Sequence, residues 1–233
     1  MQLKNVSLAI EDKPVLRSIN LNWAHGEAIA LLGANGAGKS SLLKVMSTLL
    51  HPSTGKTTMP EGMSLQKWKS KLGVVFPETF LYSSLTGYEN LLFYQKLYGK
   101  TDNEQIEQVL NQVNLSRVQQ ERVETYSKGM KQRLAIARAF VHQPTHLLLD
   151  EPFDGLDLAS KTILERLLKE KNKQGVGYVL VSHDSAHAWD LCDRAVLLHN
   201  GKIVLETPCT EKTYRSFMNQ YQEWLKEKQH DVF

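Results

Sequence analysis

A glycine-rich octapeptide near the N-terminus has the composition of a phosphate-binding loop. Residues 33–40 match the pattern G-x-x-x-x-G-K-[ST] in full, between an apolar run and a helical pattern. Glycines let the backbone fold around phosphate groups, and the amides at the start of the helix point inward with partial positive charge. We expect Lys39 to reach the β and γ phosphates and Ser40 to ligate Mg²⁺. The residues expected to bind the nucleotide here are Gly33, Ala34, Asn35, Gly36, Ala37, Gly38, Lys39, Ser40 and Ser41.

Two adjacent carboxylates, Asp150 and Glu151, follow the leucine run at 147–149. A parallel sheet presents functional groups at the carboxyl ends of its strands. We therefore expect Asp150 to meet the magnesium ion beside the phosphate loop and Glu151 to face the attacking water. An apolar strand followed by two acids is common by itself, so this interpretation depends on the phosphate loop that precedes it.

A third segment, residues 126–134, makes the prediction more specific. It resembles the signature of ABC ATPases, usually written L-S-G-G-Q, because it keeps Ser127, Gly129 and the following Gln-Arg at a predicted helix start. The departures are at Tyr126, Lys128 and Met130. The variant S-K-G-M looks like the one in many ABC exporters of polysaccharides, drugs and haem. The alternative is a plain helix N-cap at Ser127, with Lys131 and Arg133 on a solvated face.

Two further motifs follow in the order of that family. The segment Gly155-Leu156-Asp157 resembles the loop that contacts the opposite subunit. His183, in Ser182-His183-Asp184, resembles the switch histidine, which touches the γ-phosphate and orients the water, although a lone histidine after a strand is usually structural.

The resemblance covers essentially the whole chain and implies a set of roles. ATP and Mg²⁺ are held between the phosphate loop of one subunit and the signature of a second. The implied catalytic residues are Glu151, His183 and Lys39, the implied metal ligands are Ser40 and Asp150, and the implied nucleotide contacts outside the loop are Ser127, Gly129 and Asp157.

Two features of the family are missing. Ile10 stands where the family usually stacks an aromatic ring on the adenine, and aromatic stacking contributes about 1–3 kcal/mol per base. Pro77-Glu78 stands where the family carries a glutamine that links magnesium to the membrane subunit. This region also resembles, more weakly, the ATPase of the haem exporter of cytochrome c maturation. What stacks on adenine and how coupling works here stay open.

The implied function is that of an ATPase that powers transport, and export in particular, across a membrane. Its partners are transmembrane subunits, which dock on residues 77–98, and a second ATP-binding subunit, identical or different. The alternative is a soluble ABC-type ATPase that acts as a nucleotide switch without transport. Such proteins generally have paired cassettes with a charged linker or a long coiled-coil insertion, and this sequence has neither. A P-loop kinase or GTPase would leave the signature and His183 unexplained.

These motifs need a scaffold of alternating strands and helices. Alternation at Val6, Leu8 and Ile10 predicts a half-buried strand, and residues 28–32 predict a fully buried one. Asn200-Gly201 is the strongest hairpin signal in the chain. Further strands are expected at 73–76, 147–149, 178–181, 195–198 and 203–205, and helices at 39–50, 88–98, 103–113, 128–140, 158–171 and 211–228.

We therefore predict an α/β fold of the P-loop NTPase class. By the resemblance it is an ABC ATPase with a mainly parallel RecA-like core sheet, an antiparallel β portion and a helical subdomain insertion. The expected organisation is a single domain over 1–233. Its core lies at 1–76 and 141–206, its helical subdomain at 77–140 and a C-terminal helical tail at 207–233.

Composition limits the partners. The 233 residues are 42% hydrophobic, enough for one large or two small domains. The 28 basic and 25 acidic residues leave a net charge of +3 without a basic block, so we expect no nucleic-acid partner. Cys192 and Cys209 are expected to be free thiols in a reducing compartment. With no apolar signal core at the N-terminus and no bilayer-length apolar run, the expected location is cytoplasmic, peripheral on the inner face of the cell membrane.

Overall fold

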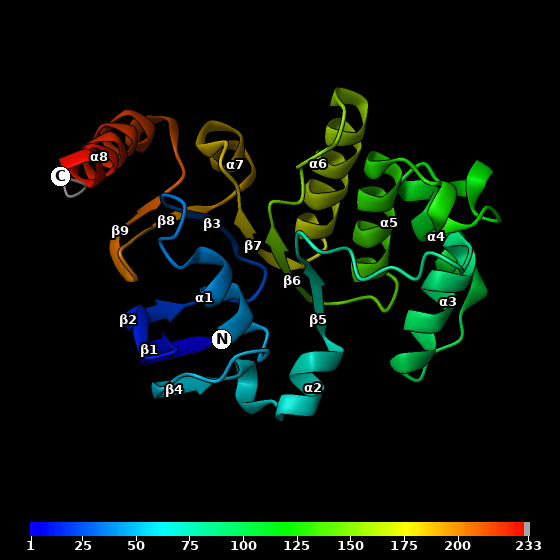
Figure 1. Ribbon diagram of the computed structural model, residues 1–233, viewed down its shortest axis with the longest axis horizontal. Helices are drawn as coiled ribbons and strands as arrows, with labels where there is room; N and C mark the ends of the chain where they lie inside the picture. The colour runs from blue at the N-terminus through cyan, green and yellow to red at the C-terminus, as the bar shows by residue number, and fades with distance from the viewer. Residues whose placement is uncertain (231–233) are drawn as a thin grey trace. The chain divides into compact units, whose positions relative to one another are not determined.

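The computed structural model describes residues 1–230 (Figure 1). The last three residues of the predicted tail, 231–233, lie outside the described residues. The chain forms two compact units. The first comprises Met1–Ser64 and the chain from Val179 onward, and the second comprises Leu65–Tyr178.

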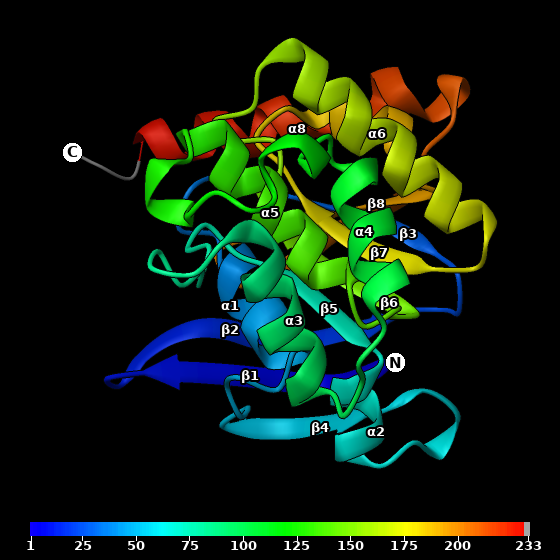
Figure 2. The same cartoon turned by 90° about the vertical axis from the view of Figure 1, so that its right-hand side faces the viewer.

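The first unit contains a three-stranded antiparallel sheet with the order β2-β1-β4 (Figure 2). Its strands are β1 (Gln2–Ile10), β2 (Lys13–Asn22) and β4 (Thr54–Thr58). Val6 and Leu8 are buried and Ile10 is exposed. The predicted antiparallel portion is therefore confirmed. The sequence pattern did not indicate β4, which reads Thr-Gly-Lys-Thr-Thr and carries no apolar residue.

A mixed sheet in the same unit positions the phosphate loop. β3 (Ala28–Leu32) pairs parallel with β8 (Arg194–His199), which pairs antiparallel with β9 (Lys202–Pro208). All five residues of β3 are buried, as its apolar run predicts. Asn200 and Gly201 adopt φ of 46° and 75°, the left-handed values that a tight hairpin requires, so the predicted hairpin is confirmed.

The α-helices in the described part of this unit are α1 (Lys39–Met46), α7 (Ser185–Leu191) and α8 (Glu211–His230). The predicted extension of the first helix to residue 50 is wrong. Thr48 takes a φ of 64°, and the amides of Leu49 and Leu50 both turn back to the carbonyl of Lys44. α8 buries Phe217, which is 1% exposed.

The second unit pairs β5 (Leu72–Val75) parallel with β6 (His146–Asp150). α5 packs on β5 so closely that a Cβ on Gly73 would lie 2.3 Å from the carbonyl oxygen of Ala139. α3, α4 and α5 also pack on one another (Figures 1 and 2). The helices of this unit are α2 (Leu65–Ser70), α3 (Gly87–Leu97), α4 (Asn103–Gln112), α5 (Lys128–Phe140) and α6 (Leu158–Lys173).

The predicted run of helices without intervening strands is confirmed by α3, α4 and α5. β7 (Gly177–Val181) is buried throughout and spans the boundary between the units along the chain. Among residues 1–230, no helix is both long enough and apolar enough to span a bilayer.

Candidate functional site

The loop between β3 and α1 is shaped by two close backbone approaches. Gly33 has a φ of +150°, and a Cβ there would lie 2.2 Å from the carbonyl oxygen of Leu198 in β8. Gly38 has a φ of +107°, and its Cβ would lie 2.9 Å from a Leu16 methyl group. Only glycine fits these two positions. The loop is also tied to the hairpin, because the Gly201 amide donates to the Ala37 carbonyl at 3.0 Å.

Lys39 begins α1 and its ammonium lies across the loop. Nζ donates to the carbonyls of Gly33 at 2.8 Å and Ala34 at 3.1 Å. The N-cap residue is Gly38, which offers no side-chain acceptor, and the first turn holds no acid. The first amides of a helix have no acceptor within the helix, and they carry partial positive charge. The lysine and the first turn, which contains Ser40 and Ser41, therefore place positive charge at this end of the loop, as the predicted anion site requires.

His183 belongs to the same unit and follows the buried strand β7. It is exposed, and it immediately precedes Asp184, the N-cap of α7, which accepts the His187 amide at 3.0 Å. The Asp184 amide in turn donates to the Ser182 hydroxyl at 3.1 Å. The turn that presents His183 is thus fixed on both sides by local hydrogen bonds.

In the second unit, β6 ends in the two predicted carboxylates. Asp150 is the last residue of the strand and is 2% exposed, while Glu151 is half-buried. Glu151 adopts a φ of 49°, a left-handed value that non-glycine residues rarely take. Such strain costs on the order of 1–3 kcal/mol and clusters at active sites. The strand therefore delivers a carboxylate that the backbone holds in a strained turn.

The turn after Glu151 is held by the signature helix α5. Gln132 is buried, and its Nε2 donates to the carbonyl of Pro152 at 3.1 Å. Arg133 also faces protein, since its Nη1 donates to the carbonyls of Val113 and Asn114 at 2.9 Å each. A solvated face at Arg133 is therefore not what the structure shows. The sequence motif contained Gln132 and Arg133 but did not reveal these contacts.

The signature and the loop at 155–157 lie side by side at the start of α5. Ser127 is the exposed N-cap of α5 and its Oγ accepts the Met130 amide at 3.2 Å. A Cβ on Gly129 would lie 3.4 Å from the carbonyl oxygen of Gly155. Asp157 is the exposed N-cap of α6, and hydrogen bonds from the Ser160 hydroxyl and amide lower the pKa of its carboxyl. These residues offer an exposed surface with a helix N-terminus at its centre.

The predicted site residues thus fall into two groups. The phosphate loop and His183 belong to the first unit, and the remaining residues belong to the second. The second group is Ser127, Gly129, Asp150, Glu151 and Asp157.

Comparison with known proteins decides the family. Residues 16–154 match the family described as ABC transporter. The chain belongs to the ABC transporter family.

One relative in this family is the linearmycin resistance ATP-binding protein LnrL of Bacillus subtilis (strain 168). It is 34% identical over 210 residues, which cover 88% of this chain and 68% of LnrL. Among solved structures, an ATP-binding subunit of an ABC transporter matches with a TM-score of 0.86 and 28% identity, covering 97% of this chain and 98% of that chain.

A dimeric ATP-binding cassette in a post-hydrolysis state with ADP and phosphate also matches. Its TM-score is 0.81 at 28% identity, over 90% of this chain and 98% of that chain. The ABC chain described here is accordingly an ATP-binding, ATP-hydrolysing subunit of a transporter. This favours the transport interpretation over a nucleotide switch without transport.

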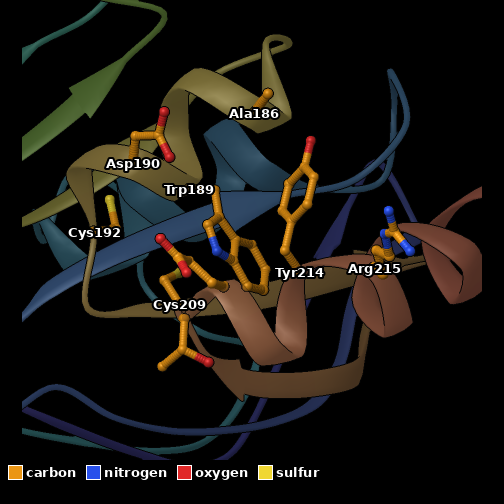
Figure 3. A pocket seen from close by; sticks show the side chains of 9 residues that line it. Ala186, Trp189, Asp190, Cys192, Cys209, Tyr214 and Arg215 are labelled. Carbon is orange, nitrogen blue, oxygen red and sulfur yellow. The ribbon is translucent and has the colours of Figure 1, made fainter.

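A cavity of about 580 Å³ in the first unit of this ABC subunit holds none of the predicted site residues (Figure 3). It lies between α7 and the start of α8, and both cysteines line it. Both thiols are free. Burial raises the pKa of the Cys192 thiol well above its usual range and that of Cys209 to about 12, so both stay protonated at neutral pH and react poorly.

Proposed function

We propose that this ABC subunit powers export of a solute through transmembrane partner subunits, as one of two ATP-binding subunits arranged head to tail. The observation that carries the proposal is the phosphate loop, where close backbone approach at Gly33 and Gly38 leaves the α1 N-terminus and Lys39 for an anion. Support for two subunits comes from the dimeric ATP-binding cassette that this chain resembles, and from the signature, which begins on an exposed helix start at Ser127. Export rests on the S-K-G-M signature variant and on a relative named for resistance.

The chemistry is hydrolysis of the γ-phosphoryl group, in which water attacks phosphorus and ADP leaves. Lys39 and the first-turn amides bind phosphate oxygens and offset their charge. Glu151 polarises the attacking water, and its strained backbone fixes the direction of the carboxylate. His183 orients that water and contacts the γ-phosphate. Ser127, Gly129 and Asp157 serve the nucleotide bound to the partner subunit.

Mg²⁺ fits the donors that the chain offers. The Ser40 hydroxyl and the Asp150 carboxylate are hard oxygen ligands of the kind that Mg²⁺ prefers. The ion would neutralise charge on the β and γ phosphates. Ser40 stands in the first turn of α1 and Asp150 at the end of a buried strand, so both oxygens are held by regular structure.

We further propose that residues 77–140 act as a helical subdomain and that transmembrane subunits dock on residues 77–98. This segment exposes aromatic side chains: Phe80 is 57% exposed, Tyr82 47% and Phe93 36%. Such a docked subunit would be cytoplasmic and peripheral on the inner face of the membrane, without a nucleic-acid partner. The resemblance to a haem exporter stays a prediction.

Replacement of Glu151 by glutamine tests the function. The amide keeps the shape of the side chain but cannot polarise water, so ATP should still bind while hydrolysis falls by about 10² or more. Glu170→Gln is the matched control, because Glu170 lies on the exposed face of α6 in a 3.9 Å pair with Arg166. The trapped variant should accumulate as a dimer with ATP. If Glu151→Gln hydrolysed ATP at the wild-type rate, Glu151 would not be the residue that polarises the attacking water.

The transport direction is tested with inside-out membrane vesicles that contain the complex. Solute uptake that requires ATP and stops with Glu151→Gln indicates export. ATP-driven loss from preloaded vesicles would indicate import and overturn the proposed direction.

A further inference from the structure

We infer that Arg138 is a positioning residue that connects the signature helix α5 to the loop between β5 and α3. This loop exposes Phe80 and Tyr82 and is called the aromatic loop below. This inference rests on the proposed docking of transmembrane subunits. It concerns a chain in which Pro77-Glu78 replaces the glutamine that the family carries, and both of these residues are exposed. Arg138 is a positioning residue and not a catalytic one, because it acts through the backbone and rings that it holds.

Arg138 lies near the C-terminal end of α5 and holds two neighbouring segments at once. Its Nη2 donates to the carbonyl of Val74, in β5, at 3.0 Å. Its guanidinium carbon lies 5.0 Å from the ring centroid of Tyr94 and 6.0 Å from that of Phe80. Both distances are within the range of cation–π attraction. A single side chain therefore links α5 to the strand before Pro77 and to the loop after it.

The aromatic loop is itself fastened to α3. The Tyr94 hydroxyl donates to the carbonyl of Phe80. The side chain of Asn90, which is fully buried, binds the backbone of Tyr82 on both sides, accepting its amide at 2.9 Å and donating to its carbonyl at 3.0 Å. The Tyr82 ring packs edge-on against Phe93 at 4.9 Å. Because these contacts hold the loop to α3, a displacement of the exposed rings by a docked subunit would move Phe80 and Tyr94 together.

The guanidinium contacts both rings and donates a hydrogen bond to the Val74 carbonyl. Among the described residues its buried Nε has no hydrogen-bond partner, so the fork is not fully satisfied by carbonyls. A planar guanidinium can donate to a carbonyl and stack on aromatic faces at the same time. A lysine ammonium is a compact, strongly hydrated charge that does not stack in this way. The position of Arg138 therefore depends on where the two rings lie.

α5 carries this dependence to the signature. The helix is 13 residues long, and Ser127 caps its other end, which places the cap roughly 16 Å from Arg138 at 1.5 Å per residue. A helix of this length behaves as a rigid element. A shift of the rings would therefore be passed through Arg138 to the start of α5, where Ser127 and Gly129 lie.

The experiment uses the complex recovered from its native membrane through a tag on this chain, reconstituted in lipid. Arg138→Gln removes the stacked cation and, because its side chain is two bonds shorter, also the bond to the Val74 carbonyl. We expect the isolated chain to keep hydrolysis within about twofold, with unchanged KM for ATP. In the complex, the stimulation of kcat over the isolated chain should fall about fivefold or more. Tyr94→Leu should reproduce this loss. Tyr94→Phe loses the bond to the Phe80 carbonyl but should retain stimulation, because the ring remains beside the guanidinium and Asn90 still holds the loop to α3. The double variant Arg138→Gln/Tyr94→Leu should be no worse than either single variant.

Arg133→Gln is the matched control. It removes an arginine from the same helix that also donates to backbone carbonyls, but these are the carbonyls of Val113 and Asn114 and not those of β5. Its stimulation ratio should match wild type even if its melting temperature falls. Equal stimulation in Arg138→Gln and wild type would overturn the inference while leaving the proposed function intact. A wild-type complex that shows no stimulation at all would refute docking-dependent coupling, and with it both proposals.

Discussion

The stability of the second unit should fall in mild acid because of His142, just beyond the end of α5. His142 is 2% exposed, and its ring stacks on Tyr98 at 3.9 Å with an angle of 3° between the planes. Its Nε2 lies 3.1 Å from the carbonyl oxygen of Leu72. Nδ1 is buried and has no hydrogen-bond partner among the described residues, so a second proton there would find no acceptor.

Burial is the main cause that lowers the pKa of His142 to about 4, with further lowering by the charges of Lys100 and Arg138, against the raising effect of the bond to Leu72. A histidine in an unfolded chain has a pKa of about 6.5. Below that pH, His142 binds a proton in the unfolded chain but stays neutral in the folded chain until the pH approaches 4. The free energy of unfolding should thus be unaffected above about pH 7, fall by about 2 kcal/mol at pH 5, and fall by about 3 kcal/mol at pH 4.

Urea unfolding followed by circular dichroism measures this loss. His142→Phe keeps a ring against Tyr98 but cannot titrate; it should cost about 1–3 kcal/mol at every pH, because the Leu72 carbonyl loses its donor, and should remove about 2 kcal/mol of the fall between pH 7 and pH 5. His51→Gln changes an exposed histidine and should keep the wild-type slope. The reasoning would be refuted if His142→Phe and wild type lost stability in parallel over this range.

Two other predictions concern the nucleotide site. Gly33→Ala should destabilise the protein by about 2 kcal/mol or more, because its Cβ would lie 2.2 Å from the Leu198 carbonyl oxygen. Gly36→Ala, with open space around its Cβ, should cost only the left-handed backbone, about 1–2 kcal/mol, and thermal unfolding compares the two. ATP and GTP should compete within about tenfold, because Ile10 offers no aromatic face for the base and the contacts proposed above address phosphate and magnesium. A titration with a much stronger preference for ATP would mean that another aromatic side chain supplies the stack.

The regular elements were predictable where one periodicity dominated the sequence. α5 begins and ends at the predicted residues, and β3 and β6 follow from their apolar runs. Prediction failed where the local sequence pattern of a segment does not match its role in the tertiary structure. β4 pairs with β1 through its backbone alone, without an apolar side chain, so its strand state depends on a partner that lies far away in the sequence.

The end of α1 shows a second kind of failure. Apolar residues continue at helical spacing to Leu50, two positions before Pro52. The structure ends the helix at Met46 with Thr48 in a left-handed conformation, and Leu49 is 63% exposed. Threonine is β-branched and disfavours this conformation, so its residue type gives no signal for the turn. The last turn of α1 buries Val45 and Met46, so the end of the helix follows burial and not the apolar spacing alone.

A sequence motif identifies residue types, but it does not reveal the backbone conformation of those residues or the hydrogen bonds that hold them. Asp150-Glu151 was recognisable as a pair of acids after a strand, yet the left-handed φ of Glu151 and the Gln132 bond to Pro152 depend on long-range packing. The same limit applies to Arg138. Its neighbours Val74, Phe80 and Tyr94 are separated from it by 64, 58 and 44 positions, so no local pattern could join them. Where a motif residue is missing, as at Pro77-Glu78, a residue that takes over its role therefore has to be found from contacts between helices, strands and loops. Arg138 makes such contacts with Val74 before these two positions and with Phe80 after them.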